Sequence, residues 1–516
     1  MNKRTLGIIL LIITVIAMNL ILLFNSSKIK YNEIIITEEE YNEIINNKTR
    51  IEDDILTSIK FNNYDLYKSS NNVDIYYSLL DNNKRRYNPT VRYVANINNS
   101  KIAIVDGVIT DEIIESNKKI KLVIYNDDSY REYTITCTTL PIMNIDYDKN
   151  IEFQVDTDYN MDMFLFDNQE IVPNRYITTE GKIEIKGKNI SSKNSFNISL
   201  KEKSLGYNTR NNEISLLDMR KDNNYVLYSL EDDQEKIRNV LASRIWYDGS
   251  ARRNSFDLDN GMYFKYIELF INGEYQGLYA LGYPIDEKVL ELSVNRNGKY
   301  DEYQFKKIND TETLADYSYK NAKSNDDRVN TILTNYNKAI NKIKNVDELK
   351  SIMDYDNYID LFLFIQFVNG VDNINKDLYI TLKNNNGRIV SIYTPWDLID
   401  TFGNLKDETG VVKPYGYKYD YFMNLSLLPL IRINDKTVMK DIKDRYKELR
   451  ETTWSTDSIT NYINDYEKDI FASGAFLRDK EKWTDGLYSD ESVKLNTLKE
   501  YINNRLTSMD KYIDNL

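Results

Sequence analysis

Residues 354–403 read DYDNYIDLFLFIQFVNGVDNINKDLYITLKNNNGRIVSIYTPWDLIDTFG and contain four successive elements. The stretch up to Gly370 starts with a possible capping Asp and is apolar on nearly all sides, which predicts a buried helix. The polar loop VDNINKD comes next, and the strands LYITLK and RIVSIY then flank the turn NNNG. The acidic turn TPWDLIDTFG ends the segment. This order predicts carboxylates at neighbouring ends of one rigid hairpin.

Three carboxylates of this segment meet the needs of phosphoryl transfer. Asp372 and Asp397 lie at the two ends of the hairpin, and Asp377 follows Asp372 by five residues. In protein kinases a catalytic Asp is followed by a metal-binding Asn and later by a metal-binding Asp. An Asp at the Asn position still offers an oxygen ligand to Mg²⁺ or Mn²⁺, but it adds a negative charge. The alternative interpretation is an ordinary Asx-rich turn that bonds its own backbone.

The composition restricts the chemistry open to this chain. Its 516 residues include no histidine and one cysteine, Cys137. These counts exclude Ser-His-Asp and Cys-His catalysis, metal sites that use His, intramolecular disulfides and Cys clusters. Cys137 lies in the alternating run YTITCTTL, which favours a small buried residue over a reactive thiol. Any metal would therefore be bound through oxygen ligands.

Length and charge set further limits. A chain of this length favours two soluble units plus an anchor. Lys and Arg number 67 against 80 Asp and Glu, which gives a formal net charge of −13. A net acidic chain lacks the basic face that nucleic acid requires, so we expect no nucleic-acid partner. The hydrophobic content of 41% is sufficient to build cores and excludes global disorder.

An uncharged apolar stretch lies near the N-terminus. Residues 6–24, LGIILLIITVIAMNLILLF, follow Lys3 and Arg4. At about 1.5 Å per residue they reach close to the roughly 30 Å of a bilayer's hydrocarbon layer. A cleaved signal peptide is the alternative, although its core is usually shorter and FNSSK offers no clear cleavage site. We expect residues 1–27 to be a single-pass signal-anchor in the cell membrane, with the bulk of the chain outside the cytoplasm.

The rest of the chain divides by its hydrophobic pattern. Residues 28–71 are polar, and we predict a spacer with a short helix at EEEYNEII. Residues 72–139 alternate apolar and polar side chains between Asn, Asp and Gly turns, which predicts a small antiparallel β-sandwich. From residue 140 to about 328 the chain is strand-rich, and helical periodicity dominates residues 329–516. The predicted fold class is α+β, with a β-rich lobe, an α-rich lobe and a cleft between them.

Two local patterns in the β-rich lobe are specific. Asn272-Gly273 links the alternating runs YIELFI and EYQGLYAL, as in a hairpin whose type I′ turn needs positive φ at both residues. Apolar residues recur at helical spacing in DQEKIRNVLASRIWY, residues 233–247, which predicts one helix. No GxGxxG or GxxxxGK[ST] phosphate loop occurs anywhere in the chain.

The blocks YIELFINGEYQGLYALGYPID (266–286) and YTPWDLIDTFG (393–403) resemble the two signature blocks of the CotH-type spore-coat protein kinase family. Weaker similarities follow the family's order over residues 140–516: LPIMNI, GKIEIKGKNISSKNSFNISLK, EKIRNVLASRI, VDNINKDLYI, RDKEKW and LKEYINNRL. The resemblance implies a two-lobed, atypical protein-kinase-like domain. Such a kinase would use ATP with Mg²⁺ or Mn²⁺ to phosphorylate Ser or Thr of secreted or surface proteins.

The resemblance also implies roles for individual residues. Asp372 matches the family's catalytic Asp, and Asp397 matches the metal-binding Asp of its WDxDxTFG turn. Asp377 would be a second metal ligand. Nucleotide binding would fall to three cations in or beside the matching blocks, namely Lys193, Lys201 and Arg238. A solvated or ion-paired residue is the alternative for each of these cations.

Four positions depart from the family's pattern. Ile399 replaces the second Asp of the turn, Tyr283 replaces a usual Glu, Asn197 replaces a basic residue, and Asp377 replaces an Asn. Each change removes or alters a charge that would bind phosphate or metal. A catalytically weak or inactive pseudokinase that binds a polymer or a partner protein is therefore the alternative function. A glycan-cleaving enzyme with two carboxylates is a third hypothesis.

Overall fold

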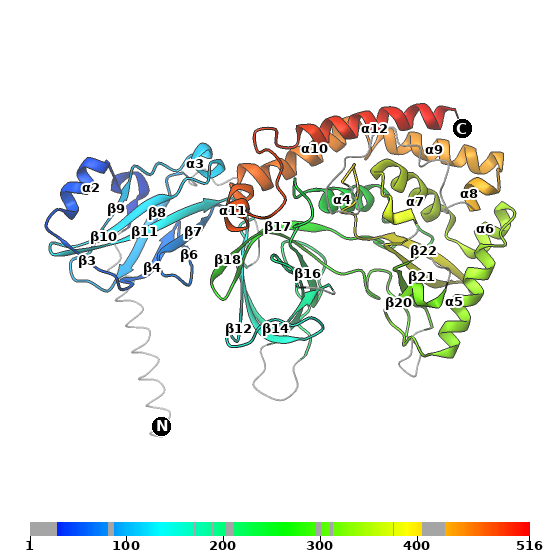
Figure 1. Ribbon diagram of the computed structural model, residues 1–516, viewed down its shortest axis with the longest axis horizontal. Coiled ribbons are helices and arrows are strands. Elements are labelled where there is room, and N and C mark those ends of the chain that lie inside the picture. Colours follow the sequence, from blue (N-terminus) through cyan, green and yellow to red (C-terminus); the bar gives the residue numbers. More distant parts are fainter. Residues whose placement is uncertain are drawn as a thin grey trace, which may run out of the picture.

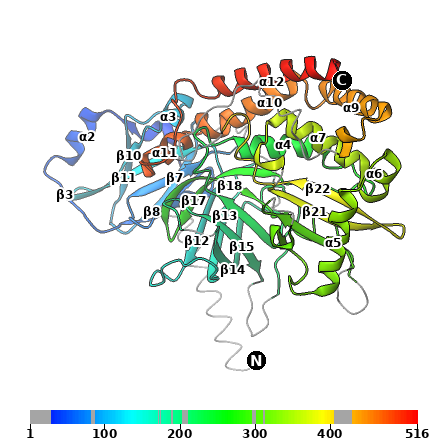
Figure 2. The same ribbon diagram turned by 45° about the vertical axis from the view of Figure 1, so that its right-hand side comes forward.

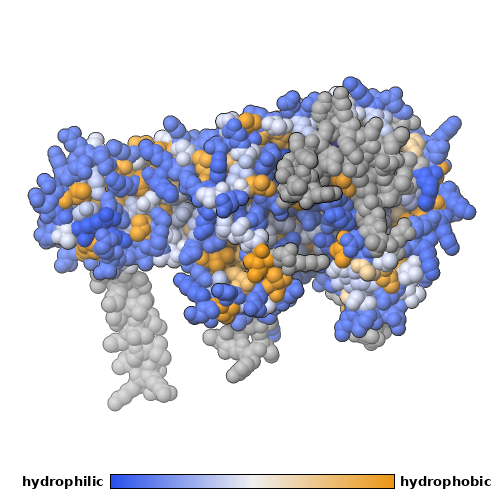
Figure 3. All heavy atoms as spheres, in the orientation of Figure 1, coloured by the Kyte–Doolittle hydropathy of each residue, from blue (hydrophilic) through white to orange (hydrophobic). Residues whose placement is uncertain are grey.

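The computed structural model describes residues 28–80, 87–169, 172, 174–187, 190–202, 210–294, 301–309, 313–374, 376–404 and 429–515. The fold is mixed α+β and runs from an N-terminal β-sandwich through a β-barrel to a helical part with one small sheet (Figure 1). The predicted signal-anchor, residues 1–27, lies outside the described residues. Within the described ranges, no helix combines the length and apolarity needed to cross a bilayer. Hydrophilic side chains cover most of the face in Figure 3.

Two sheets that share one hydrophobic core form the N-terminal sandwich. Their strand orders are β1-β8-β4-β5 and β2-β9-β10-β11-β7-β6, with β3 beside β11. The elements are β1 (Ile29–Lys30), η1 (Tyr31–Ile34), β2 (Ile35–Ile36), α2 (Glu38–Ile45), β3 (Thr49–Arg50), β4 (Leu56–Phe61), β5 (Tyr64–Asp65), β6 (Tyr67–Lys68), β7 (Asp74–Ser78), β8 (Thr90–Ala95), β9 (Lys101–Val105), α3 (Asp111–Glu115), β10 (Ile120–Tyr125) and β11 (Ser129–Thr138).

The sandwich differs from the sequence-based prediction in two ways. Residues 28–71, predicted as a spacer around α2, contribute β1 to β6 to both sheets. Several of these strands are only two residues long, too short for alternation to reveal them, and backbone pairing with later strands defines them. The pair β7–β11 is parallel, whereas the prediction was antiparallel throughout. Cys137 on β11 is buried as predicted, and burial raises the pKa of its thiol to about 12.

A closed barrel follows, with the strand order β12-β13-β14-β15-β16-β18-β17. Its elements are β12 (Ile142–Tyr147), β13 (Tyr159–Phe166), β14 (Tyr176–Lys186), β15 (Ser195–Lys201), β16 (Asn224–Tyr228), α4 (Arg238–Ser250), β17 (Phe264–Ile271) and β18 (Glu274–Gly282). The predicted hairpin turn is present, because Asn272 and Gly273 have φ values of 51° and 76° between β17 and β18. Parallel pairing of β12 with β17 closes the barrel.

The helical part surrounds a sheet with the strand order β20-β19-β21-β22. Its strands are β19 (Tyr303–Lys307), β20 (Tyr317–Tyr319), β21 (Leu378–Asn385) and β22 (Arg388–Pro395). Its helices are η2 (Leu314–Asp316), α5 (Asp327–Ile340), α6 (Val346–Ile352), α7 (Tyr355–Val368), η3 (Asp372–Ile374), α8 (Pro429–Arg432), α9 (Lys436–Glu451), α10 (Thr456–Glu467), the π-helix η5 (Lys468–Ala472), α11 (Ala475–Lys482) and α12 (Asn496–Asp514).

Helix α7 confirms the prediction of a buried helix before the acidic loop. Every residue from Asn357 to Val368 is buried, because β22 lies on one side of α7 and α4, α9 and α12 enclose it elsewhere (Figure 2). Asp354 caps its first turn by accepting from the Asn357 N–H group. The helix therefore supports the β21–β22 hairpin from behind.

Arg478 of α11 joins the sandwich, the barrel and the C-terminal helices. It is 4% exposed and ion-pairs with Glu268 of β17, which is fully buried. Its guanidinium also donates to the Asn117 side-chain oxygen (3.1 Å) and to the carbonyl of Cys137 (3.3 Å), both in the sandwich. Glu268 accepts in addition from the Thr138 hydroxyl at 2.8 Å. One buried ion pair thus connects three parts of the chain (Figure 1).

Arg478→Met should lower the free energy of unfolding by about 3–5 kcal/mol, because Glu268 would stay buried without its cation. Urea denaturation followed by circular dichroism measures the change. Lys440→Met is the matched control, because Lys440 belongs to an exposed ion pair with Asp444, and it should leave the curve unchanged. The double variant Arg478→Met/Glu268→Gln should recover part of the loss. If Arg478→Met behaves like the control, the ion pair does not hold the junction together.

Candidate active site

The β21–β22 hairpin brings Asp377 and Asp397 together. Asp377 precedes β21 and Asp397 follows β22 with only Trp396 between. Leu378 pairs with Pro395 in the ladder, and the N–H group of Trp396 donates to the carbonyl of Asp377 at 3.0 Å. Both Asp residues have a φ of 53°, the left-handed region that non-glycine residues seldom occupy. Such conformations persist where the surrounding structure determines them and concentrate at functional sites.

A buried amide ties the two acidic turns to each other. Asn373 in η3 is fully buried. Its Nδ2 group donates to the carbonyl of Asp377 at 3.0 Å and to the carbonyl of Trp396 at 2.6 Å. One side chain therefore joins the backbone of Asp377 to that of Trp396, the residue before Asp397. Asn373 was not among the predicted site residues, because an Asn in a polar loop gives no sign of its burial.

The electrostatics of Asp377 suit a cation. Burial raises its pKa, and the charge of Asp397 raises it further. Lys306 Nζ lies 3.6 Å from Oδ1 and Lys376 Nζ lies 3.7 Å from Oδ2, and both lysines oppose these effects. A divalent ion between two carboxylates relieves their repulsion. In the described parts of the chain, no three acidic side chains gather around one point. Two carboxylates that share an ion with phosphate oxygens and water form a usual Mg²⁺ site.

Asp372 is more accessible than Asp377. It opens η3, and 32% of its side chain is exposed. Lys376 Nζ lies 2.6 Å from its Oδ2. Burial lowers the pKa of Lys376, but Asp372, Asp377 and Asp400 outweigh this effect and raise it. A protonated Lys376 therefore stands between Asp372 and Asp377, and the carboxylate of Asp372 stays open to a hydroxyl group.

Lys186 completes the site from the barrel, and the sequence analysis missed it. It is the last residue of β14, with Nζ 4.4 Å from the centre of the Tyr228 ring and 5.2 Å from that of Trp396. Burial lowers its pKa to about 8, against the opposing attraction of Asp397. Ile183 and Ile185 fill the barrel, so alternation directs Lys186 outward. The outward position of Lys186 could have been predicted from this alternation in KIEIKG.

The structure does not bring Lys193 to the carboxylates of the hairpin. Lys193 is 2% exposed and donates to Asp479 of α11 at 2.6 Å and to the carbonyl of Leu278 at 2.8 Å. These contacts hold α11 against β18. The partner Asp479 lies 286 residues along the chain, so no local pattern could identify this lysine as an internal ion-pair member.

The other two predicted cations also have contacts elsewhere. Arg238, at the start of α4, is 5% exposed and ion-pairs with Asp233, at 2.6 Å, and with Glu235. Lys201 donates to the Asn211 side-chain oxygen at 2.7 Å on the barrel. It also lines a cavity of about 560 Å³ whose other charged residues are Asp146, Asp148, Asp162, Glu180 and Lys182. A nucleotide-binding role for these two residues remains a prediction that their geometry does not support.

Two of the departures from the family's pattern lie in internal contacts. Asn197 on β15 donates to Glu184 of β14 at 2.7 Å. The Tyr283 ring is buried, with the guanidinium carbon of Arg220 4.2 Å from its centre. At these two positions, the charged residue usual in the family is therefore replaced by a side chain that contacts Glu184 or Arg220.

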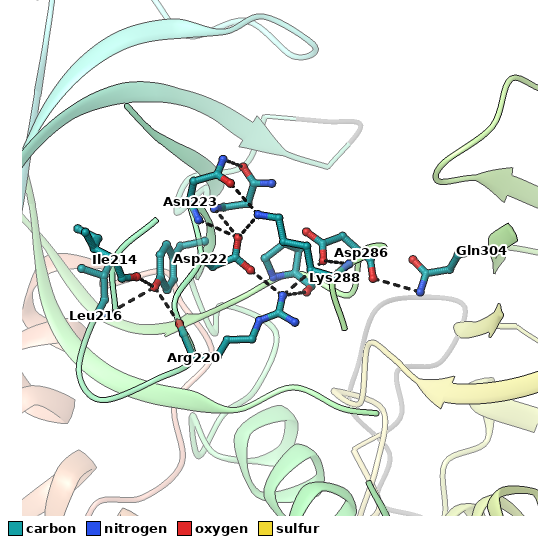
Figure 4. A network of polar contacts seen from close by, with 11 residues as sticks. Ile214, Leu216, Arg220, Asp222, Asn223, Asp286, Lys288 and Gln304 are labelled. Carbon is teal, nitrogen blue, oxygen red and sulfur yellow. Dashed lines mark hydrogen bonds and ion pairs between the residues drawn. The ribbon is translucent and has the colours of Figure 1, made fainter. Parts of the chain in front are cut away.

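A polar network beside the site connects the barrel to the small sheet (Figure 4). Arg220 lies 2.6 Å from Asp222 and 3.4 Å from Asp286, which follows β18. Lys288 Nζ lies 2.5 Å from Asp222, and Gln304 of β19 donates to the carbonyl of Asp286 at 3.4 Å. The network orients β19, the strand that carries Lys306 toward Asp377.

The lowered pKa of Lys186 can be measured directly. Acylation by an amine-specific reagent, quantified by mass spectrometry of the Lys186 peptide across a pH series, should have its midpoint at about pH 8. N-acetyl-lysine amide in the same tube should have a midpoint near pH ~10.4. Asp397→Asn should move the Lys186 midpoint down, because Asp397 favours the charged ammonium. An unchanged midpoint in this variant would show that Asp397 does not influence the charge on Lys186.

The chain resembles a known family of proteins. A family model described as CotH kinase protein matches residues 183–509, more than half of the chain. The match includes Lys186, Asp372, Asp377 and Asp397. No curated protein matches the chain. The resemblance predicted from the two signature blocks is confirmed, and the chain belongs to the CotH kinase family.

Proposed function

We propose that this protein is a protein kinase that transfers the γ-phosphate of ATP to Ser or Thr residues of surface or secreted proteins. The observation that carries the proposal is the meeting of Asp377 and Asp397 at one end of a hairpin, close to Lys186 of the barrel. Family membership supports the reaction class. In this proposal the barrel and the helical part correspond to the two lobes of a kinase.

Each site residue has a role that its surroundings favour. The accessible carboxylate of Asp372 accepts a hydrogen bond from the acceptor hydroxyl and orients its attack. Asp377 and Asp397 would hold Mg²⁺ or Mn²⁺, an ion that neutralises phosphate charge when bound. Lys186 contributes a positive charge from the barrel side. Lys376 keeps Asp372 in position through their 2.6 Å contact.

The location of the proposed kinase rests on the sequence alone. The uncharged residues 6–24 support a membrane anchor, which would place the catalytic part outside the cytoplasm. Substrates would then be proteins of the cell surface or secreted proteins. A spore coat, as the family's name suggests, is one such setting.

The pseudokinase alternative depends mainly on Ile399 at the turn. Asp400, one position later, still acts on the charge of Lys376. A negative charge therefore remains near the site although it is displaced by one residue. Calorimetry distinguishes the alternatives, because metal-dependent nucleotide binding without phosphotransfer would favour the pseudokinase.

Phosphotransfer from radiolabelled ATP to the protein itself or to casein, with Mn²⁺ or Mg²⁺, tests the proposal. Asp372→Asn should lower kcat about 10²- to 10⁴-fold, because the hydroxyl loses the group that orients it and accepts its proton. Asp397→Asn should abolish the metal dependence of nucleotide binding. Asp53→Asn, the same change at an exposed position of the sandwich, is the control and should retain activity. Full activity of Asp372→Asn would show that the assigned role is wrong.

Asn373→Asp should weaken metal binding and also lower the free energy of unfolding, because position 373 is fully buried. The variant replaces the amide donor with an oxygen that repels the carbonyls of Asp377 and Trp396. The dissociation constant for Mn²⁺, measured by electron paramagnetic resonance with a non-hydrolysable ATP analogue, should rise about 10- to 100-fold. Asn335→Asp, on the exposed face of α5, is the control. Equal Mn²⁺ affinity in both variants would contradict a positioning role for Asn373.

A further inference from the structure

One indole ring brings together lysines from the barrel and from the small sheet. Lys186 Nζ lies 5.2 Å from the centre of the Trp396 ring, and Lys306 Nζ lies 5.6 Å from the same centre. Trp396 directly precedes Asp397, and Lys306 is the lysine 3.6 Å from Asp377. Two ammonium groups from different parts of the fold therefore flank the two hairpin-end carboxylates.

A third lysine, Lys320, lies on the same face of the small sheet as Lys306. Its backbone N–H group donates to the carbonyl of Gln304 on β19, so the register places residues 304, 306 and 320 on one face. Lys320 Nζ lies 5.7 Å from the centre of the Tyr379 ring. Tyr379 in turn pairs with Lys306 across β19 and β21. The small sheet thus presents two lysines next to the site.

Carboxylates lie near these lysines without pairing directly with all of them: Asp397 and Asp377 favour the charge on Lys186, and Asp286 and Glu287 favour the charge on Lys320. Of the three lysines, only Lys306 forms an ion pair within the described parts of the chain. Lys186 and Lys320 are held by aromatic rings, and the face of a ring attracts a cation without neutralising it. Lys306 and Lys320 also disfavour the charge on Lys186. Ammonium groups that lie close enough to repel one another favour the binding of an anion that carries several negative charges.

We propose that Lys306 and Lys320 bind the polyphosphate chain of the nucleotide, together with Lys186 of the barrel. The small sheet would then supply a second cationic wall of the phosphate site. This inference rests on the proposed kinase function and adds to it the residues that hold the phosphates. It also accounts for phosphate binding in a chain with no GxGxxG loop, because lysine side chains take the place of a cradle of backbone N–H groups.

The geometry favours a triphosphate over a monophosphate. Lys186, Lys306 and Lys320 come from three strands or strand ends and can each meet a different phosphate group. Lys306 also contacts Asp377, so it would lie between a metal ligand and the phosphate chain. A nucleoside monophosphate would reach fewer of these lysines. The Lys306 and Lys320 contributions should therefore grow with the number of phosphates.

Calorimetric binding to the full chain, with Mg²⁺, tests the inference with three probes: a non-hydrolysable ATP analogue, AMP and inorganic triphosphate. Lys306→Met and Lys320→Met should each raise the Kd for the ATP analogue and for triphosphate about tenfold, the effect of one charge-assisted contact. The Kd for AMP should change less than about twofold, because few of its charges reach the sheet. Lys338→Met, exposed on α5, is the matched control and should bind all probes as the wild type does.

The outcomes separate the inference from the proposed function. If the wild type binds neither the ATP analogue nor triphosphate, the kinase proposal fails and the inference fails with it. If the wild type binds the analogue and both lysine variants match Lys338→Met, the inference is overturned while the kinase proposal stands. Equal weakening of AMP and ATP binding would also overturn the assignment to the phosphates. Lys320→Arg keeps the positive charge at this position. Its Kd for the ATP analogue should therefore stay near the wild-type value, unlike that of Lys320→Met.

Discussion

The repulsion between two carboxylates at one end of a short hairpin is the constraint on which the site depends. Asp377 and Asp397 would separate if the chain could relax. Burial raises the pKa of Asp377, and the charge of Asp397 raises it further. The hairpin prevents this separation because α7 holds it from behind. Asn357 of α7 is fully buried, donates to the carbonyl of Tyr393 at 3.0 Å and accepts from its N–H group at 2.8 Å. The packing of α7 against the hairpin thus keeps the two carboxylates close together, an arrangement that a bound cation would stabilise.

The rest of the architecture brings cations to these carboxylates from separate segments. Lys186 comes from the barrel, Lys306 from β19 and Lys376 from the loop after α7. Aromatic rings support the first two, and Lys186 forms no ion pair within the described residues, so its charge remains available to a ligand. Lys376 lies in the same continuous segment as the three carboxylates, whereas tertiary packing brings Lys186 and Lys306 to them.

The N-terminal sandwich is part of the same folded body. The buried pair Arg478–Glu268 connects it to the barrel through α11, a helix from the C-terminal part of the chain (Figure 1). The same helix supplies Asp479, which accepts from Lys193 and from the N–H group of Leu278 at 2.9 Å. Lys193 therefore stabilises a helix–barrel contact. Loss of α11 would leave Glu268 and Lys193 without their ion-pair partners.

Local patterns determined much of this protein. The α+β class, the buried helix α7, the Asn272-Gly273 turn and the order of the three acidic residues all follow from neighbouring residues, because side-chain periodicity and turn chemistry act over a few positions. The places of Asp377 and Asp397 at the end of the hairpin could be predicted for this reason. Only the tertiary structure decided which cations face them. Lys186 and Lys193 stand seven residues apart in one block, and a carboxylate from α11 buries the second and leaves the first at the site. The two-residue strands β1, β2 and β3 were missed for the same physical reason, since backbone pairing with distant strands defines them.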